Sequence, residues 1–252
     1  MIVVAITSLI MSIFDTGYHE FFYIDKLDKG VNKYVVDKER KKEAQVLLKE
    51  YEKALKDFDK NKSKQLKEIK EKNLDKNTTS DWYDELFNEM MVERVKLQQL
   101  LISQRIQLQE LITDSEWALI IEQAKKIEEK TKLKEQKKDA KGKSHDAFDK
   151  QVEVTDENLP DGVEKQEVID VLIKYQMNFL ELVQMKQGIR IGEDSQLGDK
   201  YVTKENLQEL ANELNEARFK LSQGFLDFLN ELKEITNEEE WTNIMKEVNK
   251  GI

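Results

Sequence analysis

Carboxylates are the most frequent side chains in this sequence that could perform acid–base or metal chemistry. The chain has 51 Asp and Glu residues but only two histidines, His19 and His145, and no cysteine. Thiolate metal sites, cysteine nucleophiles and multi-histidine metal sites are therefore excluded. A catalytic carboxylate pair needs an apolar cleft, whereas these carboxylates lie in charge-rich stretches. We therefore expect no enzymatic activity, no cofactor and no bound metal.

Two arginines, Arg94 and Arg218, are further candidates because the chain repeats itself. When the sequence is shifted by 124 residues, 43–126 aligns with 167–250 without a gap, and 21 of the 84 pairs are identical. Chance would give about seven identical pairs in a chain with this biased composition. Both arginines fall on an apolar helix seam, where a guanidinium must find a partner or reach the surface. Either they contact an anion or a partner protein, or they pair with a facing Glu inside the chain.

Each repeat is predicted to form three helices. The first runs over about 36–72 and carries apolar residues on one stripe, including Leu48 and Tyr51. The second begins at an N-cap threonine, Thr79 or Thr203, and continues with a heptad seam that favours antiparallel packing on the first. The predicted fold is all-α: a tandem duplication of a long helical hairpin plus a short capping helix, forming coiled-coil-like bundles.

The third helix begins with the same local element in both repeats. An N-cap residue is followed three positions later by Glu, as in a capping box, and then by Trp. The residues are Thr113, Glu116 and Trp117 in the first repeat and Asn237, Glu240 and Trp241 in the second. We expect each tryptophan to plug the open end of its hairpin. This explains the recurrence of the element without a ligand.

The start of this third helix resembles the Leu-Thr-x-x-Gln helix start of small periplasmic chaperones of the Spy/CpxP kind. The resemblance covers six residues per repeat, Ile112 to Trp117 and Thr236 to Trp241, and Glu stands where the family has Gln. Those chaperones hold clients on a basic concave surface, whereas this chain has a net charge of −10. The resemblance implies an envelope chaperone or a stress-binding role.

The sequence opens with an uncharged apolar segment, Ile2–Phe14. Its thirteen residues would span about 20 Å as a helix, which is shorter than the roughly 30 Å of a bilayer core but suits the core of a signal peptide. No basic residue precedes it, and several follow it. We expect an export signal or a membrane anchor. The alternatives are packing on the protein's own core and an amphipathic contact with a partner.

These patterns divide the chain into four parts. They are an anchor- or signal-like segment with its lead-in (1–35), a first helical repeat (36–130), a charged linker (131–166) and a second helical repeat (167–252). The linker has a basic half, which could extend the preceding helix, and an acidic half with the sole proline of the chain. Its composition is typical of a solvated connection.

The charge pattern and the apolar segment together indicate the class of function. Lysine-rich stretches, 26–76 and 125–143, could meet anionic lipid or nucleic acid, but acidic residues interleave them, and the acidic overall charge argues against nucleic acid. We expect a non-enzymatic, envelope-associated protein, membrane-anchored or periplasmic, that presents long helix faces to a protein partner or to itself. One alternative is a soluble cytoplasmic scaffold or adaptor with Ile2–Phe14 packed on its own core. Another is a periplasmic chaperone-like module.

Overall fold

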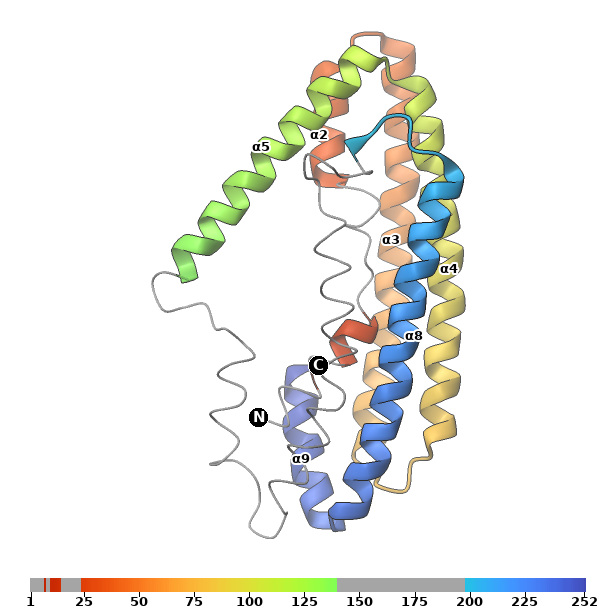
Figure 1. Cartoon of the computed structure of the whole chain (residues 1–252), viewed down its shortest axis with the longest axis vertical. Helices are drawn as coiled ribbons and strands as arrows, with labels where there is room; N and C mark the ends of the chain where they lie inside the picture. The colour runs from red at the N-terminus through yellow and green to blue at the C-terminus, as the bar shows by residue number, and fades with distance from the viewer. Residues whose placement is uncertain (1–6, 8–9, 15–23, 140–197) are drawn as a thin grey trace.

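The computed structural model describes residues 7, 10–14, 24–139 and 198–252 of the chain. In these residues the regular secondary structure is helical, without strands, and the long helices pack together as a bundle (Figure 1). The all-α prediction is confirmed. The first helix predicted for the second repeat and the later part of the predicted linker lie outside the described residues.

A helical hairpin forms the first half of the bundle. Helix α3 (Lys38–Asn73) begins at the N-cap Asp37, and α4 (Ser80–Leu111) begins at the N-cap Thr79. Each cap side chain accepts a hydrogen bond from a backbone N–H of the first turn, which would otherwise have no partner. The two helices pack against each other, and the predicted apolar stripe of α3, including Leu48 and Tyr51, is buried.

The helices of the second half match those of the first at a spacing of 124 residues. Helix α8 (Lys204–Ile235) has 32 residues, as α4 has, and it begins after Thr203, the counterpart of Thr79. Helix α5 (Asp114–Asp139) and helix α9 (Glu238–Gly251) begin 124 residues apart. Their lengths differ, because α5 has 26 residues and α9 has 14. The expected short capping helix is therefore found in the second half, whereas α5 continues through the basic stretch to Asp139.

Helices α4 and α8 lie side by side and run in opposite directions (Figure 1). Gln98 exchanges hydrogen bonds with Asn215, at 2.6 and 3.2 Å, and Gln223 donates to Asp84 at 3.0 Å. A short helix, α2 (Ile24–Tyr34), packs on α5. A Cβ atom at Gly30 of α2 would lie only 2.9 Å from Ile120, so the small residue permits this close approach.

Three described residues of the apolar N-terminal segment belong to the core. Ile10, Ile13 and Phe14 are 0%, 3% and 0% exposed. The Phe14 ring meets Phe87 of α4 edge to face, with ring centroids 6.0 Å apart. The Thr7 hydroxyl donates to the Val248 carbonyl of α9 at 3.3 Å. Within the described residues, no helix is both long and apolar enough to cross a bilayer.

Candidate functional site

The two predicted cap-plus-tryptophan elements lie at opposite ends of the bundle (Figure 1). Both tryptophans are buried: Trp117 is 4% exposed and Trp241 is 0% exposed. Each indole nitrogen donates to a backbone carbonyl of the other half, near the connection that precedes α4 or α8. Trp117 reaches Gly198 at 3.0 Å, and Trp241 reaches Asn73 at 2.8 Å. The elements therefore join the two halves, in addition to covering the helix ends.

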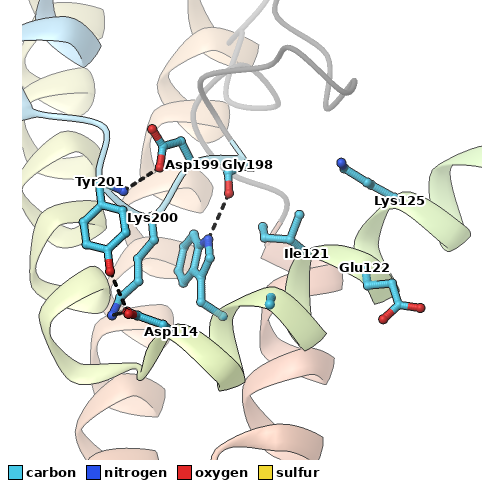
Figure 2. A pocket seen from close by; sticks show the side chains of 10 residues that line it. Asp114, Ile121, Glu122, Lys125, Gly198, Asp199, Lys200 and Tyr201 are labelled. Atoms are coloured by element: carbon cyan, nitrogen blue, oxygen red, sulfur yellow. Dashed lines mark hydrogen bonds and ion pairs between the residues drawn. The ribbon is translucent and has the colours of Figure 1, made fainter.

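A surface pocket of about 420 Å³ lies beside Trp117, between α5 and residues 198–201. Figure 2 shows Lys200 and Tyr201 pointing toward Asp114, whose carboxylate accepts hydrogen bonds from both, at 2.5 and 2.7 Å. The bond from Lys200, followed by that from Tyr201, lowers the pKa of Asp114. Asp114 is thus an ionised link between α5 and the segment before α8, rather than a proton donor.

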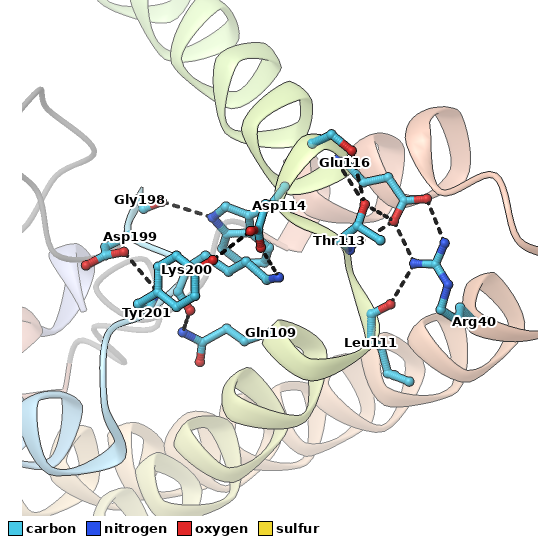
Figure 3. Close-up of polar contacts among 12 residues, drawn as sticks. Arg40, Gln109, Leu111, Thr113, Asp114, Glu116, Gly198, Asp199, Lys200 and Tyr201 are labelled. Carbon is cyan, nitrogen blue, oxygen red and sulfur yellow. Dashed lines mark hydrogen bonds and ion pairs between the residues drawn. The ribbon is translucent and has the colours of Figure 1, made fainter.

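Glu116 fixes the start of α5 to the start of α3 (Figure 3). Its carboxylate accepts two hydrogen bonds from Arg40, at 2.6 and 3.0 Å, and one from the Val36 backbone N–H at 3.0 Å. It also accepts from the Thr113 N–H at 3.0 Å, while the Glu116 N–H donates to the Thr113 hydroxyl at 3.3 Å, so the predicted capping box is present. Arg40 additionally donates to the Leu111 carbonyl at the end of α4.

The surroundings of Glu116 keep its carboxyl group ionised. The hydrogen bond from Arg40 lowers its pKa to about 2, with help from the Thr113 and Val36 N–H groups, although burial acts in the opposite direction. Asn237 and Glu240 form the same capping box at α9. In the described structure the Glu240 carboxylate accepts a hydrogen bond from the Asn237 N–H at 2.8 Å, and the Glu240 N–H donates to the Asn237 side chain at 3.0 Å. The two capping boxes are alike in local form, but only the first is tied to another helix by an arginine.

A cation lies over each tryptophan ring. The Arg105 guanidinium is 4.1 Å from the Trp117 ring centroid and donates to the Asp199 carbonyl at 3.0 Å. Burial lowers the pKa of Arg105 to about 9, against a smaller opposing effect of Asp199. The Lys233 ammonium lies 5.6 Å from the Trp241 ring centroid, and burial lowers its pKa.

One contact at each end occupies equivalent positions of the two halves. Gln109 donates to the Val202 carbonyl at 3.1 Å, and Lys233 donates to the Thr78 carbonyl. Gln109 and Lys233 are 124 residues apart, and so are Thr78 and Val202. The two halves are therefore related by an approximate two-fold arrangement. In it, a side chain near the end of α4 or α8 binds the segment that precedes the other of these two helices.

Asn73 is a further member of the site that sequence reasoning missed. It is fully buried, accepts from the Tyr83 hydroxyl at 2.9 Å and donates to Asn249 at 3.1 Å. Asn249 also donates to the Lys70 carbonyl at 2.6 Å, which attaches α9 to the last turn of α3. Arg105 and Gln109 were missed as well. All three are polar residues near or on an apolar seam, and this is the signal that could have indicated them.

The structure places Arg94 and Arg218 inside the bundle, each 1% exposed. Arg94 donates to the Ile13 carbonyl at 2.6 Å and thereby holds the N-terminal segment on α4. Arg218 lies 3.5 Å from the side-chain oxygen of Asn215 on its own helix. Both are thus on the predicted seam, in the middle of α4 and α8. Their contact with an anion or a partner protein stays a prediction.

Metal ligation has no support in the part of the chain that the structure describes, where no three His, Asp or Glu side chains gather in a suitable group. The geometry of both ends instead joins helices and carbonyls. No family model, no curated protein and no solved structure matches the chain in comparisons with known proteins.

Proposed function

We propose that this chain is a non-enzymatic helical scaffold, built by tandem duplication of a three-helix unit, which presents long helix faces to a protein partner. Its apolar first segment packs on its own core. The observation that carries the proposal is the burial of Ile10, Ile13 and Phe14 against the bundle. An apolar segment that is already covered by the protein contributes to folding stability, because its surface is removed from water.

The duplication is supported by the equal lengths of α4 and α8 and by their equivalent caps. It is also supported by the reciprocal hydrogen bonds of Trp117 and Trp241. Two copies of one sequence naturally form an isologous pair, in which each copy uses the same surface on the other. In this chain both copies belong to one polypeptide.

A structural role is supported by what the strongly hydrogen-bonded and pKa-shifted groups do. Glu116, Asp114 and Arg105 each connect separate segments of the chain. Shifted pKa values can also mark catalytic groups, but here hydrogen bonds to structural partners lower the pKa of Glu116 and of Asp114, and burial lowers the pKa of Arg105. The outward faces of α3, α4 and α8 are left for contact with other molecules.

The envelope-associated form of this proposal differs in the position of the N-terminal segment. In that form, residues 2–14 would enter a membrane, or would direct export. The buried position of Ile13 and the hydrogen bond from Arg94 to its carbonyl favour the packed form.

Cysteine labelling distinguishes the two forms, because the chain has no cysteine of its own. In the folded protein, Ile13→Cys should react with a maleimide only after unfolding, since Ile13 is 3% exposed. Met11→Cys is the matched control and should react at once, since Met11 is 39% exposed. Anionic phospholipid vesicles should change neither rate. Rapid labelling of the Ile13→Cys protein, or an environment-sensitive label on it that moves into vesicles, would refute the packed form.

A further inference from the structure

The exposed surface of α3 carries a continuous line of lysines, which we name the lysine stripe. It consists of Lys38, Lys42, Lys49, Lys53, Lys56, Lys60, Lys64 and Lys67, all of them exposed. At 100° per residue, these positions lie within about 40° of one line along the helix and extend over about 44 Å. Between Lys38 and Lys67, Val46 is the one uncharged residue that lies on the same line of the helix surface. The acidic residues that alternate with lysines in the sequence of α3 lie mainly beside this line.

The outward surface of α8 carries acidic residues at the same helical spacing, and we name this line the acidic stripe. It consists of Glu205, Glu209, Glu213, Glu216, Asp227 and Glu234, all of them exposed. The acidic stripe spans 29 residue steps, as the lysine stripe does, and so has the same length of about 44 Å. Lys220 is the one basic residue that lies on the same line of the α8 surface, between Glu216 and Asp227.

The two stripes match in register as well as in length. When α3 and α8 are aligned in parallel with an offset of 167 residues, five lysines stand opposite five acids. The pairs are Lys38 with Glu205, Lys42 with Glu209, Lys49 with Glu216, Lys60 with Asp227, and Lys67 with Glu234. One position places like charges together, Lys53 opposite Lys220. Complementary charges at such facing positions fix the partner and the orientation of paired helices.

The stripes are separated within one molecule. Helix α4 packs against both α3 and α8, so the outward faces of α3 and α8 are directed to solvent. In the described part of the chain, the ion pairs of the stripes are local ones on the same helix, Lys56 with Glu52 at 3.9 Å and Glu216 with Lys220 at 3.5 Å. Most of the charges of both stripes are therefore available to another molecule.

We propose that the lysine stripe of α3 binds the acidic stripe of α8 on a second copy of this chain. The proposal rests on the proposed scaffold function and names its partner as the protein itself. A copy that uses its lysine stripe on one neighbour still offers its acidic stripe to another, so the contact is heterologous and permits assemblies larger than a dimer.

The net charge of −10 determines the conditions for the test. At about 0.1 M salt the Debye length is near 10 Å, which screens the repulsion between whole molecules more than the attraction between facing side chains. Sedimentation equilibrium of the full chain should then give an average mass that rises above 29.7 kDa with concentration. At about 1 M salt the association should weaken at least about tenfold.

Charge reversal on either stripe tests the contact itself. One variant carries Lys42→Glu, Lys49→Glu and Lys60→Glu. The other carries Glu209→Lys, Glu216→Lys and Asp227→Lys. Each variant alone should be monomeric, because three of the five facing pairs then bring like charges together. An equimolar mixture should associate again, with both variants in the assembly, since the variants complement each other.

The matched control reverses three exposed acids of α4, Glu85→Lys, Glu89→Lys and Glu110→Lys. It changes the net charge as the α8 variant does, and it should associate like the wild type. Circular dichroism would verify that each variant folds.

A wild type that is monomeric at all concentrations, reversal variants that associate unchanged, or a mixture that stays monomeric would overturn the second-copy contact. The cysteine-labelling result would be unaffected, so failure of this inference is distinguishable from failure of the proposed function.

Discussion

Glu116 illustrates how one ionised side chain can hold several chain segments together at the residue scale. It connects α5 to Arg40 of α3 and to the backbone before α3, and it completes the capping box with Thr113. Hydrogen bonds to a charged group are stronger than those between neutral groups. Because the carboxylate is nearly buried, removal of its charge would leave several donors without an adequate partner.

We predict that Glu116→Gln lowers the free energy of unfolding by about 2 kcal/mol at pH 7, since it weakens charge-assisted hydrogen bonds. The pKa of Glu116 is about 2 in the folded protein and ordinarily near 4.5, so the unfolded chain binds more protons between these values. The stabilisation is therefore complete above about pH 4.5 and is lost as the pH falls toward 2. Urea unfolding at several pH values measures it.

The matched control for this substitution is Glu240→Gln, at the equivalent position of α9. Glu240 lacks a counterpart of the Arg40 pair among the described contacts, so this variant should lose less than about 1 kcal/mol. Equal losses from the two variants would show that the Arg40 ion pair adds nothing to the capping box.

At the scale of elements, the capping helices join parts of the chain that are distant in sequence. Helix α9 packs on the last turns of α3, where Trp241 and Asn249 bind the carbonyls of Asn73 and Lys70. These carbonyls belong to the end of a helix and have no partner within it. A side chain from another helix therefore stabilises this end as a C-cap would.

We predict that Trp241→Phe lowers the free energy of unfolding by about 2 kcal/mol, because the buried Asn73 carbonyl loses its indole donor. The control is Trp82→Phe, since Trp82 is half-buried at the start of α4, and it should change stability by less than about 1 kcal/mol. Urea unfolding followed by circular dichroism measures both. A Trp241→Phe protein as stable as the wild type would mean that the hydrogen bond to Asn73 has no net effect.

At the scale of the whole molecule, the two halves share one core. Helices α4 and α8 pack along their lengths, and each end of the bundle combines a capping helix from one half with an interhelical segment from the other. The aromatic cluster of Phe14, Tyr83, Phe87 and Phe225 also takes residues from both halves. Removal of either half would expose this apolar surface to water.

A cleavable chain tests this shared core. We insert a protease recognition sequence after Gly142, cut the folded protein, and measure elution by size exclusion. The two fragments should elute together at the position of the uncut protein and should separate only in denaturant. Separate elution of two helical fragments under native conditions would show that the halves fold as independent domains.

The helix starts and caps were predictable from sequence because they depend on residues three or four positions apart. Thr79, Thr203, Thr113 and Asn237 cap helices where the pattern indicated. The buried positions of Trp117 and Trp241 followed from apolar periodicity. The carbonyls that these tryptophans bind could not be predicted, because Gly198 and Asn73 are distant in sequence and only the packing of α4 on α8 brings them near.

The sequence by itself determined the helical class, the 124-residue correspondence and the capping elements, because these follow from local periodicity and side-chain chemistry. Only the tertiary structure decided that Ile13 and Phe14 are covered by the bundle, since an apolar segment of that length is equally suited to a signal, an anchor or a core. It also decided which charges of α3 and α8 face solvent. Exposure depends on which side of each helix the neighbouring helices cover, and no single helix contains that information.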